Sequence, residues 1–156
     1  MRLYHSSYVS VEQPDTVHSR DYLDFGKGFY LTSIHEQAVR YGQRFIRRQK
    51  DAWLNIYEFK FEPSEWKIRT FDSYDRDWLN FVANCRAGKD DTDFDLVIGG
   101  IANDKVILTL DRYFDGEISE NETLGLLKYE KPNIQYCIRS QSMLNECLKH
   151  IESNRL

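Results

Sequence analysis

Hydrophobic and polar residues along this chain of 156 residues follow two periods, one typical of strands and one typical of helices. Short apolar or alternating runs predict strands at residues 3–5, 28–31, 53–61, 66–71, 96–98 and 134–138. A spacing of three to four residues predicts helices after residue 33, after residue 73, and over residues 103–113, 120–129 and 140–151. We therefore expect an α+β fold whose strands are split between the two ends of the chain.

Polar residues that can cap a helix precede three of these helices. Thr32 or Ser33 is expected to cap the first, with Glu36 placed for a capping box. Ser73 is expected to cap the second, and Ser140 the last, which runs through residue 151. Apolar residues recur on one face of the first helix, at Ile34, Ala38, Tyr41 and Phe45. Because no internal repeat or linker interrupts this pattern, residues 1–156 are expected to form a single domain.

Composition and charge narrow the class of protein. Hydrophobic residues make up 41% and aromatic residues 14% of the chain, which is typical of a folded domain and not of a disordered one. The formal charge of −4 produces no overall field that would attract nucleic acid. No run approaches the ~18 apolar residues of a membrane span, and the first residues lack the apolar segment of a signal peptide. We therefore expect a cytoplasmic protein with no membrane partner.

The cysteines and histidines do not indicate a metal site. Cys85, Cys137 and Cys147 lie far apart in the sequence, without the paired spacing of metal ligands. Four histidines are present, and none clusters with a cysteine, whereas a zinc site needs about four ligands. We expect reduced thiols that pack as small hydrophobic residues, and no bound metal.

Three short segments place polar or aromatic groups on strands or at their edges. They are residues 4–7 (Tyr-His-Ser-Ser), residues 25–30 (Phe-Gly-Lys-Gly-Phe-Tyr) and residues 134–136 (Ile-Gln-Tyr). Each segment is weak evidence alone. A single strand histidine is most often structural, and the Gly-Lys-Gly of the second segment is too short for a phosphate loop.

Together these segments resemble the diphtheria-toxin and poly(ADP-ribose) polymerase branch of the ADP-ribosyltransferases. That branch has a His on its first strand, a Tyr on its second and usually a Glu on a late strand. His5 and Tyr30 match the first two, and Tyr41 follows Tyr30 at the family's separation for two rings that sandwich nicotinamide. The pattern is closer still to small bacterial proteins of this clan, which share the F-G-K-G-F-Y-L-T run and an x-Q-Y strand. The resemblance spans residues 3–148, and residues 25–41 are its most specific part.

The resemblance implies a split antiparallel β-sheet core flanked by helices, with NAD, the substrate, in the cleft between the halves. It assigns catalytic roles to His5, Tyr30 and Gln135. It assigns NAD binding to Ser6, Arg20, Gly28, Phe29 and Tyr41. A cationic nicotinamide ring suits two tyrosine faces, because stacking and cation–π attraction both favour it. His5 is expected to hold a ribose hydroxyl, the backbone of Ser6 the nicotinamide amide, and Arg20 the pyrophosphate.

Three positions depart from the family pattern. Ser6 replaces a usual glycine, and Ala38 replaces a serine that polymerases often use to bind the amide. Gln135 stands where the family has glutamate. Glutamine keeps the hydrogen bond to the ribose but has no charge and cannot act as a general base. This argues against elongation to poly(ADP-ribose). Single transfer needs an acceptor that is already nucleophilic, or a carboxylate from elsewhere, for which Asp104 is a candidate.

Mono-ADP-ribosyl transfer from NAD to a protein or nucleic acid is therefore the leading expectation. The resemblance further implies the toxin of a toxin–antitoxin pair, with a cognate antitoxin as partner. A catalytically silent NAD-binding module and an NAD glycohydrolase are the alternatives. Arg40, Arg44 and Arg47 share one face of the first helix, and Arg48 and Lys50 extend the charge. That face is either simply solvated or a surface for an acidic partner or a nucleic-acid backbone.

Overall fold

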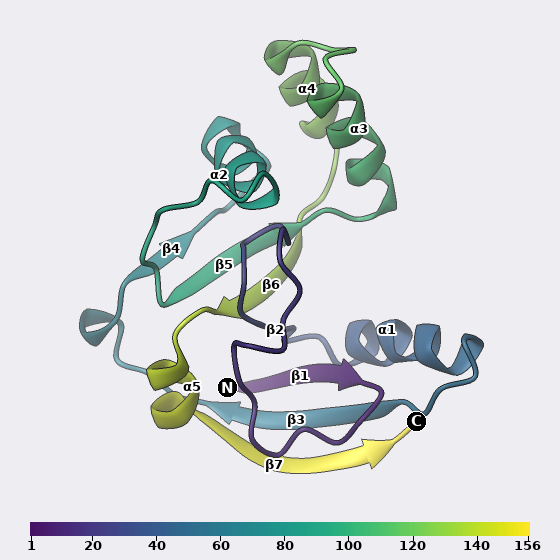
Figure 1. The fold of residues 1–156 in the computed structure, drawn as a ribbon, viewed down its shortest axis with the longest axis vertical. Helices are drawn as coiled ribbons and strands as arrows, with labels where there is room; N and C mark the ends of the chain where they lie inside the picture. The colour runs from purple at the N-terminus through teal and green to yellow at the C-terminus, as the bar shows by residue number, and fades with distance from the viewer.

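The computed structural model describes residues 1–156, which form seven strands, five α-helices and one short 3-10 helix (Figure 1). The strands are β1 (Arg2–Ser7), β2 (Phe29–Leu31), β3 (Trp53–Phe59), β4 (Ile68–Thr70), β5 (Leu96–Ile101), β6 (Asn133–Ile138) and β7 (Leu148–Arg155). The helices are α1 (His35–Arg47), η1 (Pro63–Glu65), α2 (Arg76–Arg86), α3 (Asp104–Phe114), α4 (Glu120–Leu127) and α5 (Gln141–Cys147). The predicted α+β class is confirmed.

The strands form two sheets that are joined at one point. One sheet has the order β1-β3-β7 and is antiparallel throughout. The other has the order β2-β6-β5-β4, in which only the β4–β5 pairing is parallel. An isolated bridge connects β1 to the end of β2, where Tyr4 N–H donates to the Thr32 carbonyl (2.8 Å) and Thr32 N–H donates to the Tyr4 carbonyl (3.0 Å). Beyond this bridge β1 and β2 leave each other for different partner strands (Figure 1).

Three apolar clusters hold the layers together. A small cluster of Ala38, Leu54 and Ile56 lies between α1 and the β1-β3-β7 sheet. A cluster of ten buried residues, which includes Leu3, Phe29, Tyr57 and Ile138, lies between the two sheets. The largest cluster, centred on Phe25, Trp78 and Val97, joins the second sheet to α2, α3 and α4. The order of layers is therefore helix, sheet, sheet, helices, with the two sheets packed on each other.

The start of α1 differs from the prediction. Its N-cap is Ile34, which has no side chain able to accept a hydrogen bond. The Thr32 hydroxyl accepts from Ile34 N–H at 3.1 Å and is also bonded to the Gln37 side chain. The Glu36 capping box does not form, because Thr32 is held in the bridge to β1 and the N-cap lies one residue after Ser33 and two after Thr32.

The face of α1 that packs on the sheet also differs from the predicted apolar face. Of the four apolar positions only Ala38 is buried, whereas Ile34 is 50% and Tyr41 is 48% exposed. Small residues make the contact: Gly42 lies so close to the sheet that an added Cβ would come within 3.3 Å of Ser6 Oγ. Close approach of a helix to a strand requires small side chains at the contact, so Tyr41 is left on the surface.

The predicted last helix is wrong beyond Cys147. α5 ends there, and residues 148–155 form β7, which pairs with β3 along its whole length. The register shifts between Ile56 and Tyr57, so β7 carries an extra residue at that point. A bulge of this kind breaks the two-residue alternation by which a strand is recognised in a sequence. Pairing with the edge of β3 therefore makes residues 148–155 a strand and not a helix.

Of the other two predicted caps, Ser140 is confirmed and Ser73 is wrong. Ser140 caps α5 as expected and accepts from Met143 N–H at 3.2 Å. Ser73 does not cap α2, because Asp75 takes that position and accepts from Trp78 N–H at 2.9 Å. Serine and aspartate are both favourable N-cap residues, and the helix uses Asp75, which lies two residues nearer its start than Ser73.

The cysteines are free, as expected, and Cys85 and Cys137 are buried. Burial raises the pKa of both thiols to about 12, so they stay protonated and pack as apolar groups. No helix in the chain combines the length and the apolar character needed to cross a membrane.

Candidate functional site

The candidate site lies where β1 and β2 part, and its first feature is a stretch of unpaired backbone. The backbone N–H and C=O of Tyr4 both bond to Thr32, so these two groups of Tyr4 face β2 and not β3. Backbone groups alternate in direction along an antiparallel strand, so those of Ser6, two residues on, point the same way. β2 has left β1 at that level. The N–H and C=O of Ser6 are therefore an adjacent donor and acceptor with no strand partner on this side, although Ser6 as a whole is only 6% exposed. We call this place the notch.

His5 spans the notch from β1 to β2. Its Nδ1 lies 2.7 Å from the Tyr30 carbonyl oxygen, and its ring packs on Phe29 with the ring centroids 4.3 Å apart. A carbonyl only accepts, so Nδ1 carries the proton and Nε2 is left as an acceptor. Burial lowers the pKa of His5, which keeps the ring neutral near pH 7. Phe29 and the Tyr30 carbonyl together fix which nitrogen His5 can offer to a ligand.

Tyr30 is held by its hydroxyl. The hydroxyl donates to the Gly26 carbonyl at 2.6 Å and accepts from Phe25 N–H at 3.1 Å. The ring lies nearly parallel to that of Phe25, at 13° and 6.4 Å between centroids. Burial raises the pKa of Tyr30 far above its usual range, so the hydroxyl keeps its proton. The residue can thus offer a ligand the face of a fixed ring, while its hydroxyl organises the segment before β2.

Tyr41 and Tyr30 lie on the same side of the sheets. Tyr4 points towards α1, where its ring meets that of His35 edge-on. Thr32 is its cross-strand partner and Tyr30 is two residues before Thr32, so the side chain of Tyr30 projects from this same side. On α1, Tyr41 follows closely on the contact in which Ser6 Oγ donates to the Ala38 carbonyl at 2.5 Å. Tyr41 and Tyr30 therefore project from the same side of the sheets, Tyr41 half exposed on α1 and Tyr30 packed against the cluster that contains Phe25.

Gln135 on β6 joins this arrangement from the second sheet. Tyr30 pairs with Cys137, and Gln135 is two residues away on β6, so its side chain is on the same face as Tyr30. Diagonal neighbours of this kind have Cα atoms about 7–8 Å apart. The Gln135 amide is partly exposed and bonds no group of the folded chain. It is free to bind a polar ligand group.

The remaining predicted residues lie outside the notch or serve packing. Gly28 is buried, and an added Cβ would lie 2.6 Å from Cys137 Sγ, so the glycine allows β6 to approach. Arg20 is exposed in the loop before β2 and makes no ion pair. Asp104 is exposed in the first turn of α3, which Asn103 caps, and no bond ties it to the notch.

A buried asparagine on β3 supports the notch, and the sequence pattern did not single it out as a functional residue. Asn55 on β3 is fully buried and its Nδ2 donates to the His5 carbonyl at 3.2 Å. Its Oδ1 accepts from Val11 N–H at 2.8 Å and from the Ser153 hydroxyl at 2.6 Å. The Tyr57 hydroxyl donates to the Val11 carbonyl at 2.6 Å. These bonds fix the path of the chain as it leaves β1. A lone asparagine within the apolar run of residues 53–57 is the signal that could have revealed it.

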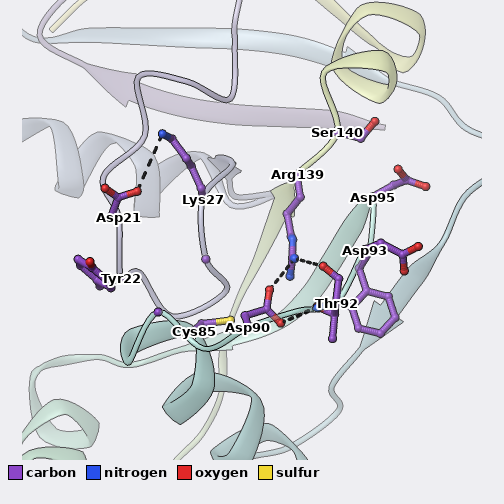
Figure 2. Close-up of a pocket in the computed structure, with 13 residues that line it drawn as sticks. Asp21, Tyr22, Lys27, Cys85, Asp90, Thr92, Asp93, Asp95, Arg139 and Ser140 are labelled. Carbon is purple, nitrogen blue, oxygen red and sulfur yellow. Dashed lines mark hydrogen bonds and ion pairs between the residues drawn. The ribbon is translucent and has the colours of Figure 1, made fainter.

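A hollow with a volume of about 620 Å³ lies beside the Gly-Lys-Gly turn. Figure 2 shows that carboxylates of Asp21, Asp90, Asp93 and Asp95 line it, against the cations of Lys27 and Arg139. Arg139 donates to Asp90 at 2.7 Å, and Lys27 lies 3.9 Å from Asp21, so both cations are already paired. An excess of carboxylates repels a diphosphate or any other polyanion, so this hollow does not suit an anionic ligand. The acidic run at residues 90–95 marks it in the sequence. No group of three His, Cys, Asp or Glu side chains in the chain could hold a metal ion.

Comparison with known proteins identifies a family without assigning a function. The model of a family described as "Protein of unknown function (DUF3990)" matches residues 1–150. No curated protein and no solved structure matches the chain. Since the match extends over nearly all of the sequence, the chain belongs to the DUF3990 family.

Proposed function

We propose that this protein is an NAD-dependent mono-ADP-ribosyltransferase of the branch that contains diphtheria toxin and the poly(ADP-ribose) polymerases. The observation that carries the proposal is the notch. There the unpaired backbone of Ser6 and the neutral acceptor nitrogen of His5 lie where the sheets part, and Tyr30 and Tyr41 project from the same side of the sheets. Such a parting between two sheets also fits the split core that the resemblance implies.

Nicotinamide matches the donors and acceptors of the notch. Its carboxamide has one acceptor oxygen and donor hydrogens, which pair with the N–H and C=O of Ser6. In NAD the ring is cationic, so the faces of Tyr30 and Tyr41 attract it through stacking and cation–π interaction. The Ser6 side chain is turned to the Ala38 carbonyl, so serine in place of glycine leaves the backbone contacts open.

His5 and Gln135 are suited to the ribose next to nicotinamide. His5 Nε2 accepts a hydrogen bond from a ribose hydroxyl, because Nδ1 is committed to the Tyr30 carbonyl. The Gln135 amide bonds a second hydroxyl and orients the reacting carbon. In the reaction the bond from ribose C1 to the nicotinamide nitrogen breaks, and its electron pair leaves with neutral nicotinamide. A lone pair of the acceptor forms the new bond to C1, and any proton on the acceptor passes to water.

The neutral Gln135 limits the reaction to acceptors that need no general base. One transfer to a nucleophilic acceptor fits this limit, and chain growth through ribose hydroxyls does not. The resemblance to small bacterial proteins of the clan supports a toxin that acts in the cytoplasm and is neutralised by a cognate antitoxin. Hydrolysis of NAD by water and silent NAD binding are the competing outcomes.

Incubation of the purified protein with NAD labelled in the adenylate part distinguishes these outcomes. Label on a macromolecule of a bacterial lysate, with release of nicotinamide, supports transfer. Free ADP-ribose alone would support a glycohydrolase, and NAD binding without nicotinamide release would support a silent module; either result overturns the proposal.

Two variants test the assignment of the notch. Tyr41→Ala and His5→Ala are expected to lower nicotinamide release at least tenfold. Tyr41 is exposed on α1, so its loss leaves the fold intact. His18→Ala is the matched control, because His18 is exposed and bonded only to Asp15. Unchanged activity in both notch variants would refute the site.

A further inference from the structure

The C-terminal half of α1 and the residues after it carry a concentrated positive charge. Five exposed cations lie within eleven positions, although the chain as a whole has a formal charge of −4. We call this the basic α1 surface; its cations are Arg40, Arg44, Arg47, Arg48 and Lys50. Figure 1 shows α1 beside β1, at the end towards which the β1 arrow points. The surface therefore begins next to the notch.

None of these five cations forms an ion pair within the chain. Nine of the sixteen other lysines and arginines do, among them Arg86 with Asp24 and Arg139 with Asp90. A solvated helix face usually carries carboxylates among its cations, but between residues 37 and 50 there is no Asp or Glu. The charge of this surface is thus available to an external polyanion.

A row of aromatic rings runs through the same surface. Tyr41 meets Phe45 at 5.8 Å between centroids, and Phe45 meets Tyr8 at 6.1 Å. Tyr8 follows β1 and is 56% exposed, and Tyr41 is 48% exposed. Arg44 lies over the Tyr41 ring at 5.1 Å, and Lys50 lies over the Tyr8 ring at 5.5 Å. The row starts at Tyr41 on α1 and ends at Tyr8, beyond the tip of β1.

We infer that the basic α1 surface binds single-stranded nucleic acid, which is the acceptor of ADP-ribose; the second half of this statement rests on the proposed function. This polymer matches both the cations and the exposed rings of the surface. Its phosphates pair with the cations, and its unpaired bases stack on the rings. An acidic peptide would satisfy the cations but not the rings. In double-stranded nucleic acid the bases are stacked on each other, so they are not available to stack on the exposed rings.

The transfer step balances without a general base. The nicotinamide–ribose bond breaks and its electron pair leaves with nicotinamide. A lone pair on a ring nitrogen or an anionic phosphate oxygen of the bound strand attacks ribose C1, and no proton must be removed beforehand. This matches the neutral amide of Gln135, which cannot activate a hydroxyl.

Binding is tested by fluorescence anisotropy with labelled single-stranded DNA and RNA of mixed sequence, in the absence of NAD. The double variant Arg44→Glu/Arg47→Glu is expected to weaken binding at least tenfold at 50 mM salt. Its salt slope should become shallower by about 1.4, since each phosphate contact on a single strand contributes roughly 0.7. Tyr8→Ala should weaken binding about tenfold, and Tyr8→Trp should restore it. Lys60→Glu/Lys131→Glu makes the same change in net charge on exposed residues elsewhere and should have no effect beyond twofold.

The outcomes separate this inference from the proposed function. If wild-type protein releases nicotinamide but binds no oligonucleotide, or if the control pair weakens binding as much as the α1 pair, the inference is wrong and the proposed function stands. If labelled NAD modifies protein and never the oligonucleotide, the inference is also wrong. If oligonucleotide binds through the α1 surface but nicotinamide is never released, binding is supported and the proposed transferase fails. Label transferred to the single strand, and lost in the Arg44→Glu/Arg47→Glu variant, supports both.

Discussion

Replacing Tyr30 with phenylalanine removes the hydroxyl oxygen and keeps the ring. The variant therefore tests whether the hydroxyl serves stability while the ring serves ligand binding. The hydroxyl donates to the Gly26 carbonyl and accepts from the N–H of fully buried Phe25, so Tyr30→Phe leaves two backbone groups without partners. A buried group left unpaired costs about 1–3 kcal/mol. We expect the free energy of unfolding to fall by about 3 kcal/mol, which lowers Tm by roughly 6–12 °C for a chain of this size. The ring remains, so the KM for NAD should stay within about threefold.

Thermal unfolding followed by circular dichroism measures the first effect, and nicotinamide release measures the second. Tyr129→Phe is the matched control, because Tyr129 is 86% exposed and its hydroxyl bonds no other group; it should change the free energy of unfolding by less than about 0.5 kcal/mol. A Tyr30→Phe protein as stable as the wild type would refute the anchoring role. A stable variant whose KM rises more than tenfold would show that the phenol oxygen itself contacts NAD.

Three further results are expected. Gln135→Glu supplies the missing charge and should raise the transfer rate at least tenfold, measured with labelled NAD; a rate that falls would mean that Gln135 does not face the reacting ribose. Asn55→Ala removes a fully buried hub and should lower the free energy of unfolding by about 3–5 kcal/mol in a denaturant titration; a loss below 1 kcal/mol would contradict its role. His5 has a pKa in the folded chain that burial lowers below the ordinary 6.5. It therefore contributes stability that is full above pH 6.5 and is lost as pH falls below it, because only the unfolded chain then gains the proton.

The His5 prediction is measured as the difference in the free energy of unfolding between the wild type and His5→Phe. That difference should shift against the wild type as pH falls from 7 to 5. A shift in favour of the wild type would mean that His5 gains a proton on folding, and the neutral acceptor nitrogen assigned to it would be wrong.

Several elements could be predicted because their signals are local. The apolar runs of β3, β5 and β6 and the periodic faces of α2 and α3 are contained within each segment. The cap of α5 at Ser140 is also a short-range interaction. The segments that hold His5, Tyr30 and Gln135 stood out for the same reason, since each places a polar or aromatic residue on a short strand.

Where distant segments compete, the local pattern was insufficient. Residues 148–155 have no alternation strong enough to indicate a strand, because a bulge interrupts it, and the free edge of β3 recruits them. The predicted apolar face of α1 fails because Ala38 and Gly42 permit a closer contact than the larger residues beside them. Asn55 and the acidic hollow were missed because their partners are far apart in the sequence.

The sequence by itself determined the kind of fold, the positions of most strands and helices, and the residue types available for chemistry, because propensity and periodicity act over a few residues. Only the tertiary structure decided that β1 and β2 part beyond Tyr4 and Thr32 and leave the Ser6 backbone without a strand partner on that side. It also decided which nitrogen of His5 is free, since the proton is fixed by a carbonyl 25 residues away. Strand pairing and hydrogen bonds between remote segments set these features, and no local pattern encodes them.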